Sequence, residues 1–330
     1  MRALATLSQM ELIRGFHNIT ADHAGCVATI GNFDGVHLGH QAVLGQLAEQ
    51  GAKLGLPVVV ILFEPQPQEF FAGEAGAPSR LTRFREKIQT LRRYSVDRVV
   101  VLPFNRRLAA MEPEQFVRDL LVGGLGVKYL VVGDDFRFGH QRRGDYASLQ
   151  AAGERYGFQV ASMRSFMIGG ERVSSTRIRR ALARGDMALA EQLLGRVFRL
   201  SGKVVHGDQR GRQLGFPTAN IDLHRLTLPV QGVFAVEAFG VEGEPVAGVA
   251  NIGVRPTFCG KRPVLEVHLF DFEGDLYGRH VEVEILHKIR SERRFESLDA
   301  LVAQIDQDIE TARDFFGGRI ASAEDSLVAS

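Results

Sequence analysis

Residues 1–185 alternate short apolar runs with segments in which apolar residues recur at helical spacing. The runs are short and rich in β-branched residues, as in strands buried on both faces of a parallel sheet. This alternation predicts a Rossmann-like α/β domain with a parallel sheet over residues 1–185. The expected strands are 27–30, 57–63, 98–102, 129–132 and 158–163, the expected helices are 38–50, 83–94 and 113–121, and 68–78 is expected to be an irregular loop.

The pattern changes after residue 185, where short alternating segments are separated by glycine-containing turns. Their number and spacing predict a small antiparallel β-barrel in a second domain, 186–330. An amphipathic segment, 298–315, predicts a helix that closes this barrel, and residues from Gly317 onward are expected to form a frayed tail. The expected barrel strands are 198–205, 233–239, 246–252, 264–270 and 280–286.

Composition and charge narrow the function classes. The 330 residues include 40 basic and 39 acidic side chains, a near balance that argues against a general nucleic-acid or membrane-surface binder. Cys26 and Cys259 are the only cysteines and lie far apart in sequence, so both are expected to be reduced and buried. No run approaches the roughly 18 apolar residues of a membrane span. We therefore expect a cytoplasmic protein, a monomer or weak homo-oligomer, with small-molecule partners.

The strand end and helix start at residues 30–41 carry the first candidate site. His37 and His40 lie three positions apart where the helix begins, so both imidazoles are expected on one face, near the free N–H groups that favour phosphate. Gly31 allows a tight turn, and Gly39 leaves room for a flat ligand such as a nucleotide base. These features predict a polyphosphate site; the alternative is an ordinary turn with surface histidines.

A hydroxyl run followed by arginines, at 173–180, is the second candidate. Arg177 and Arg179 stand near a helix N-terminus, where positive side chains oppose the helix dipole. A bound anion would offset this repulsion, with hydroxyls from Ser174, Ser175 and Thr176 beside it. The alternative is a helix cap with solvated arginines.

The second domain contains a glycine-rich segment, 202–220, that lacks the spacing of a P-loop. Lys203, Arg210 and Arg212 could cover phosphates. Thr218 and Asn220 alternate along an extended segment and could present two neutral oxygens to Mg²⁺. A structural β-turn is the alternative.

Glu266 is the candidate general base of the second domain. Strict alternation in 264–270 places Glu266 and His268 on one face of a strand and apolar residues on the other. If that face lines a ligand site, Glu266 can accept a hydroxyl proton. The alternative is a solvated outer face.

Seven motifs in order make the chain resemble the bifunctional prokaryotic riboflavin kinase/FAD synthetase family. The first half contributes GNFDGVHLGH, VGDDFRFG and VSSTRIR, and the second half contributes GRQLGFPTAN, NIGVRPTF, LEVHLFDF and DLYG. The resemblance implies two enzyme activities. A riboflavin kinase transfers a phosphoryl group from ATP to riboflavin, and an FMN adenylyltransferase converts FMN and a second ATP to FAD and pyrophosphate. Mg²⁺ is the implied cofactor.

The resemblance also implies roles for individual residues. His37, His40, Arg179 and Glu266 would be catalytic, with Glu266 as the kinase base, and Thr218 and Asn220 would hold Mg²⁺-ATP. Gln66 departs from the histidine that some members carry at this position. The implied ATP-binding residues of the adenylyltransferase are Gly31, Asn32, Phe33, Asp34, His37, Gly39, His40, Ser174, Ser175, Thr176 and Arg179. The residues implied to bind the flavin in the adenylyltransferase are Phe63, Asp135, Phe136 and Arg137. The residues implied to bind ATP in the kinase are Gly202, Lys203, Gly215, Phe216, Pro217, Thr218 and Asn220.

Two other functions remain open from the sequence. A flavin-binding regulatory protein could keep the same fold without turnover. A nucleotidyltransferase could carry a barrel that binds nucleic acid, although a net charge of +1 speaks against that partner.

Overall fold

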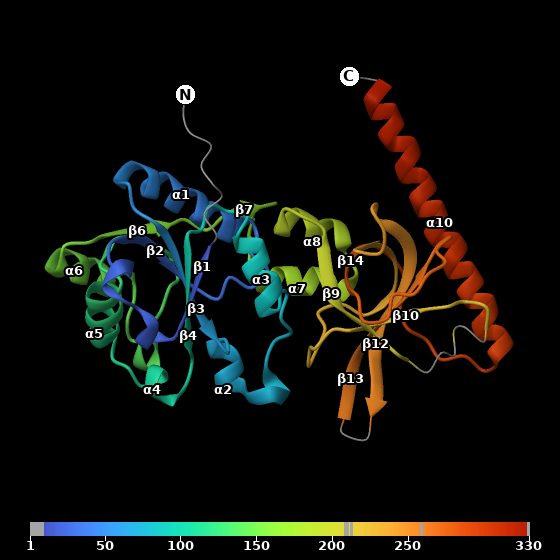
Figure 1. Cartoon of the computed structure of the whole chain (residues 1–330), viewed down its shortest axis with the longest axis horizontal. Helices are drawn as coiled ribbons and strands as arrows, with labels where there is room; N and C mark the ends of the chain where they lie inside the picture. Colours follow the sequence, from blue (N-terminus) through green and yellow to red (C-terminus); the bar gives the residue numbers. More distant parts are fainter. Residues whose placement is uncertain (1–9, 208–210, 212–213, 258–259, 329–330) are drawn as a thin grey trace. The chain divides into compact units, whose positions relative to one another are not determined.

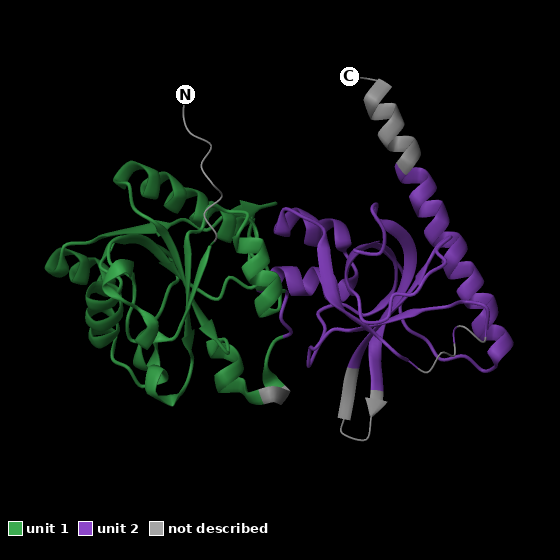
Figure 2. Cartoon of the chain, in the orientation of Figure 1, with its two compact units in different colours: residues 1–78, 82–175 green, residues 79–81, 176–330 purple. Residues whose placement is uncertain are grey.

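A computed structural model of the chain describes residues 10–207, 211, 214–257 and 260–328. The chain forms two compact units (Figure 2). Unit 1 comprises Met1–Pro78 and Thr82–Ser175, and unit 2 comprises Ser79–Leu81 and Thr176–Ser330. Residues 176–185, expected at the end of the first domain, therefore cluster with unit 2.

Unit 1 is built on a six-stranded sheet, as expected for a Rossmann-like domain (Figure 1). Its order is β1-β4-β3-β2-β5-β6, and all pairings are parallel. The chain moves from β2 toward one edge and then continues from β5 toward the other, so the strand order reverses between β2 and β5. Ligands bind at such a reversal, beyond the carboxyl ends of the strands. The strands are β1 (Glu11–Arg14), β2 (Cys26–Ile30), β3 (Val58–Glu64), β4 (Arg98–Pro103), β5 (Val127–Gly133) and β6 (Gln159–Met163).

Helices cover both faces of this sheet. Apolar residues of α1 (Leu38–Leu54) and α3 (Phe84–Leu91) pack on one face. Those of α5 (Pro113–Phe116), the π-helix η3 (Val117–Gly124) and α6 (Tyr146–Tyr156) pack on the other. Unit 1 also contains the short helix α4 (Arg106–Ala109) and the hairpin of β7 (Met167–Ile168) and β8 (Glu171–Arg172).

The loop expected at 68–78 was a wrong prediction, because α2 (Pro67–Gly76) occupies most of this segment. Pro67 stands in the first turn, where its fixed φ favours a helix and its missing N–H costs nothing. The Gln66 N–H donates a 2.8 Å hydrogen bond to Glu69, which caps the first turn. The local capping chemistry therefore outweighed the flexible composition of the segment.

Unit 2 is a closed antiparallel barrel in the order β10-β13-β12-β11-β14-β9, so the predicted barrel is confirmed. One strand, β10, had been expected only as an extended segment carrying Asn220. Two helices, α7 (Ser175–Arg184) and α8 (Met187–Leu194), precede the barrel in sequence. The strands are β9 (Phe198–Val205), β10 (Ala219–Asp222), β11 (Gly232–Phe239), β12 (Val246–Thr257), β13 (Gly260–Leu269) and β14 (His280–Arg290).

The predicted closing helix is α10 (Leu298–Val328), whose buried Ala312 packs with Val233, Val249 and Phe270 of the barrel. The tail expected from Gly317 was a wrong prediction, because the helix continues to Val328. A glycine inside a helix costs only about 1 kcal/mol relative to alanine, and no proline follows. Among the described residues, no helix is both long and apolar enough to cross a membrane.

Candidate active sites

The turn between β2 and α1 brings the two predicted histidines together. His37 is the N-cap of α1, and its Nδ1 accepts a 3.4 Å hydrogen bond from the His40 N–H. The His37 and His40 rings stack at 3.7 Å between centroids, and Phe33 stacks on His40 at 4.6 Å. Both imidazoles thus share one face, as expected. Because Nδ1 accepts the hydrogen bond from the His40 N–H, the His37 ring carries a proton on Nε2.

Gly39 suits this arrangement. A Cβ at position 39 would lie 3.3 Å from the His37 ring, closer than ordinary van der Waals contact. A side chain there would therefore require the His37 ring to shift by a few tenths of an ångström. The absence of a side chain was expected to make room for a ligand, and the structure shows that it also makes room for the imidazole.

The carboxylate of Asp34 is buried. The residue is 2% exposed, and its Oδ1 accepts a 3.0 Å hydrogen bond from the Thr82 N–H. Ser175 Oγ donates a 2.9 Å hydrogen bond to the Asp34 carbonyl, which ties the hydroxyl run to the turn. These contacts give Asp34 a role in building the turn, and its contact with ATP stays a prediction.

The other members of the hydroxyl and arginine segment are distributed over both units. Ser174 and Ser175 end unit 1, and Thr176 and Arg179 belong to unit 2. Arg179 Nε donates a 2.6 Å hydrogen bond to the Ser79 carbonyl. The roles of Ser174, Thr176 and Arg179 toward ATP stay predictions.

The predicted flavin residue Phe63 lies at the carboxyl end of β3 in a cluster of phenylalanines. Its ring meets Phe104 edge to face at 5.7 Å between centroids. Phe70 and Phe71 of α2 contact the same Phe104 ring at 5.3 and 5.8 Å. Phe71 is 71% exposed, so the cluster offers an aromatic surface beyond the strand end. Phe104 was missed from the sequence, because its apolar character also suits a core position.

The segment after β5 holds the other three flavin candidates. Asp135 forms a two-bond ion pair with Arg172 of β8, at 2.7 and 2.9 Å. Hydrogen bonding from Arg172 holds the pKa of Asp135 below its usual range, although both side chains are exposed. Phe136 stacks on Phe138, and Arg137 pairs with Asp145 at 3.1 Å. Asp135 and Arg137 are therefore both ion-paired in this structure.

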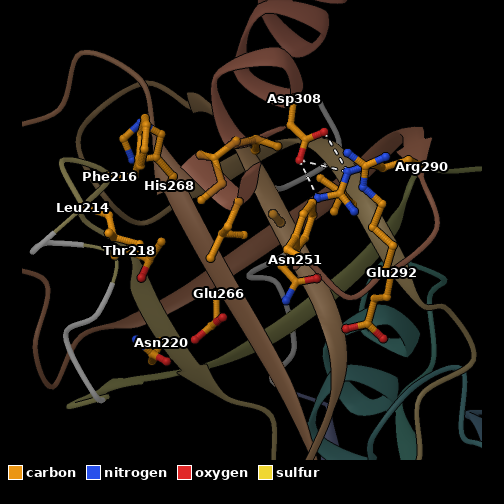
Figure 3. Close-up of a pocket in the computed structure, with 18 of the residues that line it drawn as sticks. Leu214, Phe216, Thr218, Asn220, Asn251, Glu266, His268, Arg290, Glu292 and Asp308 are labelled. Atoms are coloured by element: carbon orange, nitrogen blue, oxygen red, sulfur yellow. Dashed lines mark hydrogen bonds and ion pairs between the residues drawn. The ribbon is translucent and has the colours of Figure 1, made fainter. Parts of the chain in front are cut away.

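Unit 2 contains a cavity of about 390 Å³, lined by barrel strands, the 290–295 segment and α10 (Figure 3). One part of the lining is apolar and includes Val233, Val249, Phe295, Leu301 and Ile305. Another part is polar and includes Thr218, Asn220, Asn251, Glu266 and Glu292. The lining, which also includes Arg290, Arg293 and Asp308, therefore offers apolar, polar and charged contacts to one ligand.

Glu266 lies at the centre of the polar part. It pairs with Asn220 across β10 and β13, and with Asn251 across β12 and β13. Figure 3 shows its side chain between the two asparagines. Glu266 and His268 both line the cavity, so the polar face of β13 is a cavity wall rather than a solvated outer face. Asn251 was missed from the sequence, where its one signal was a polar residue within an apolar strand.

Arg255 adds a contact that the sequence did not reveal. Its Nη2 donates a hydrogen bond to the Glu266 carboxylate from the neighbouring strand β12. The candidate base is thus oriented by an arginine within the same cavity. Ion pairing between residues eleven positions apart has no local sequence signal.

The glycine-rich segment is only partly described, and Arg210 and Arg212 lie outside the described residues. A Cβ at Gly207 would come within 2.4 Å of the Asn220 amide, and one at Gly211 within 3.2 Å of Thr218 Oγ1. These two glycines therefore let the backbone approach Thr218 and Asn220 closely. Gly207, Gly211, Thr218 and Asn220 thus form a narrow cradle with two neutral side-chain oxygens, one from Thr218 and one from Asn220.

The remaining kinase candidates support this cradle or lie outside the cavity. Phe216 lines the cavity and meets His268 edge to face, and His268 Nδ1 lies 2.9 Å from the Pro217 carbonyl. Gly202 and Lys203 are not among the cavity residues. A Cβ at Gly202 would lie 2.3 Å from the Asp222 carbonyl, so this glycine allows close approach of β9 and β10. ATP contacts of Gly202, Lys203, Gly215 and Pro217 stay predictions.

Comparison with known proteins assigns both units. The FAD synthetase family matches residues 19–177, and the riboflavin kinase family matches residues 194–316. The bifunctional riboflavin kinase/FMN adenylyltransferase of Escherichia coli is 57% identical over 309 residues, which cover 93% of this chain and 98% of that protein. This chain belongs to the bifunctional riboflavin kinase/FMN adenylyltransferase family. The Haemophilus influenzae member is 52% identical, covering 93% of this chain and 99% of its own.

A solved structure also matches nearly the whole chain. A Streptococcus pneumoniae protein, described as a macrolide-efflux protein, is 30% identical with a TM-score of 0.80. The match covers 92% of this chain and 99% of that chain. The predicted division after residue 185 falls between the FAD synthetase and riboflavin kinase matches.

Proposed function

We propose that this chain converts riboflavin to FAD at two separate sites, an adenylyltransferase site that includes the histidine turn and a kinase site in the barrel. The chain is a riboflavin kinase and an FMN adenylyltransferase, with riboflavin, FMN and ATP as substrates. The assignment of residues rests above all on the arrangement of Thr218, Asn220 and Glu266 around one cavity in the riboflavin kinase region.

At the kinase site, Glu266 accepts the proton of the terminal ribityl hydroxyl of riboflavin. The hydroxyl oxygen then attacks the γ-phosphorus of ATP, and the bond to the β-phosphate oxygen breaks to release ADP. Arg255 holds the Glu266 carboxylate in place. The apolar part of the cavity receives the isoalloxazine ring, and the polar part receives the ribityl chain and the phosphates.

Mg²⁺ fits the cradle at this site. Thr218 and Asn220 offer neutral oxygens, which this hard cation accepts, and Gly207 and Gly211 keep the surrounding backbone close. When bound, the ion neutralises charge on the phosphates of ATP. Thr218 and Asn220 are the residues of this chain that would hold it.

At the adenylyltransferase site, a phosphate oxygen of FMN attacks the α-phosphorus of ATP, and the bond to pyrophosphate breaks. No proton acceptor is needed for an ionised phosphate, so catalysis consists of alignment and charge stabilisation. The His37 Nε2–H, the His40 ring and the N-terminus of α1 contribute positive potential on one face. We assign Ser174, Ser175, Thr176 and Arg179 to the ATP phosphates, and Phe63, Asp135, Phe136 and Arg137 to the flavin of FMN.

We also propose a cytoplasmic location and a monomeric or weakly associating state. The two cysteines, which lie far apart in sequence and are expected to be reduced, support the location. Sedimentation velocity over a hundredfold range of protein concentration tests the state, and a stable oligomer throughout that range would contradict it.

Product analysis tests the function. Purified protein is incubated with riboflavin and ATP, with and without Mg²⁺, and the flavins are separated by chromatography. We expect FMN to appear first and FAD second, and both to require the ion. Unchanged riboflavin in the presence of Mg²⁺ would favour the alternative, a flavin-binding protein without turnover.

A further inference from the structure

The turn before α1 has two residues in strained backbone conformations. Phe33 has φ +48° and Val36 has φ +41°, both in the left-handed region that L-residues avoid. Val36 is also β-branched, which makes this region still less favourable. Such conformations persist only where surrounding structure holds them, and they are frequent at functional sites. Contacts that hold this turn are therefore candidates for a functional role.

Two buried residues of segment 82–87, Thr82 and Lys87, supply polar contacts to three of the four turn positions 32–35. Thr82 donates its N–H to Asp34 Oδ1 at 3.0 Å, and its Oγ1 accepts a 3.0 Å hydrogen bond from the Gly35 N–H. Lys87 Nζ donates a 2.5 Å hydrogen bond to the Asn32 carbonyl. Segment 82–87 thus fixes the turn on both sides of Phe33.

Lys87 is the least expected of these residues. It is 1% exposed, although lysine is rarely buried to that extent because loss of hydration disfavours the charged ammonium. Apolar residues of similar volume can replace buried ions without loss of stability, so packing alone does not explain a lysine on the buried face of α3. The contact with the Asn32 carbonyl gives this side chain a specific task.

That contact fixes one peptide group. In a trans peptide the carbonyl and the N–H point in opposite directions, so the Phe33 N–H points away from Lys87. An ammonium bound to the carbonyl also polarises the peptide and makes its N–H a stronger donor. The effect of Lys87 thus reaches the far side of the turn, where Phe33 stacks on His40.

We infer that Lys87 is a positioning residue for adenylyl transfer, which holds the Asn32–Phe33 peptide and with it the histidine turn. This inference rests on the proposed assignment of the turn to the adenylyltransferase reaction. Lys87 acts through the peptide, without contact with the reacting atoms.

The test uses the full-length chain, in which the kinase reaction serves as an internal control. Lys87→Met keeps the approximate volume and removes the ammonium, and Thr82→Val removes the hydroxyl that accepts from Gly35. For FAD formation from FMN, we expect Lys87→Met to lower kcat about 100-fold, the scale of loss from about 1 Å of misplacement. The KM for ATP in this reaction should change less than about threefold, because alignment is lost rather than affinity. The rate of FMN formation from riboflavin should stay within about twofold of the wild-type rate.

Matched variants separate positioning from folding. Lys53→Met removes an exposed lysine from α1 and should leave both activities unchanged. Lys87→Arg restores a cation and should recover part of the loss.

If Lys87→Met does not fold, the result for Thr82→Val decides the question. We expect Thr82→Val to lower the kcat of FAD formation about tenfold and to leave FMN formation unchanged. A selective loss of FAD formation in neither Lys87→Met nor Thr82→Val would overturn the inference. This holds both when the two activities fall together and when neither activity falls. Intact FAD formation in His40→Ala would instead overturn the proposed function of the turn.

Discussion

Asn220 of β10 lies directly opposite Glu266 of β13, and both residues line the same cavity. Directly opposed residues on antiparallel strands have Cβ atoms about 4.5–5.5 Å apart. The amide and the carboxylate can therefore act on adjacent groups of one ligand. This relationship puts a candidate metal ligand next to the candidate base.

Asn220→Ala should weaken the kinase reaction through its Mg²⁺-ATP. Loss of one oxygen contact to a charged group is worth about 1.5–3 kcal/mol, so the KM for Mg²⁺-ATP should rise by about 10-fold to 100-fold. FAD formation from supplied FMN should be unaffected. Mg²⁺ titrations of FMN formation check this, and an unchanged Mg²⁺ dependence would remove Asn220 from the metal site.

Arg255→Ala should lower the kcat of the kinase by about tenfold or more, because the Glu266 carboxylate loses the guanidinium that orients it. The KM for riboflavin should change little. Arg255→Lys should recover only part of the rate, since an ammonium lacks the planar fork of donors. Steady-state kinetics of FMN formation test both variants, and wild-type kcat in Arg255→Ala would show that Glu266 needs no such partner.

Glu292→Gln should stabilise the folded protein at neutral pH. Partial desolvation raises the pKa of Glu292 above its ordinary value of 4.5, although the residue is exposed, so folding weakly favours the protonated carboxyl. The associated stability is fully present below pH 4.5 and is lost as the pH rises through the folded-state value. The Tm of Glu292→Gln should exceed that of the wild type more at pH 7 than at pH 4. The neighbouring variant Glu296→Gln is the control, and equal Tm differences for Glu292→Gln at both pH values would contradict the prediction.

Asp308→Ala should destabilise unit 2. The Asp308 carboxylate, 4% exposed, accepts hydrogen bonds at 2.7–3.1 Å from Arg290, which links α10 to β14. Removing one partner leaves a largely buried charge uncompensated, at a cost of about 3–5 kcal/mol. Urea unfolding followed by residual kinase activity measures this. The exposed Asp314→Ala on the same helix should cost less than about 0.5 kcal/mol, and an equally small loss for Asp308→Ala would contradict the assigned role.

Local periodicity explains what could be predicted from the sequence. Alternation along β13 placed Glu266 and His268 on one face, and the three-residue spacing placed His37 and His40 together. Both inferences need only the geometry of one strand or one helix start. The alternation of strands and helices likewise predicted the parallel sheet and the barrel.

Contacts between distant segments explain what could not be predicted. Lys87 looks like a surface lysine of an amphipathic helix until the fold brings it to Asn32, 55 positions earlier. Arg255 and Asn251 meet Glu266 only through the pairing of β12 with β13. At α2 the deciding contacts are local, since Pro67 and Glu69 stabilise the first helical turn within a segment whose glycine and alanine content favours a loop.

The most direct test of two separate sites is a reciprocal pair of variants in one assay with riboflavin and Mg²⁺-ATP. His40→Ala should accumulate FMN and form no FAD. Glu266→Gln should leave riboflavin unconverted, with FMN formation reduced at least about 100-fold, and should still form FAD at the wild-type rate from supplied FMN. Loss of both activities in either variant, with the folded state verified by circular dichroism, would contradict the two-site account.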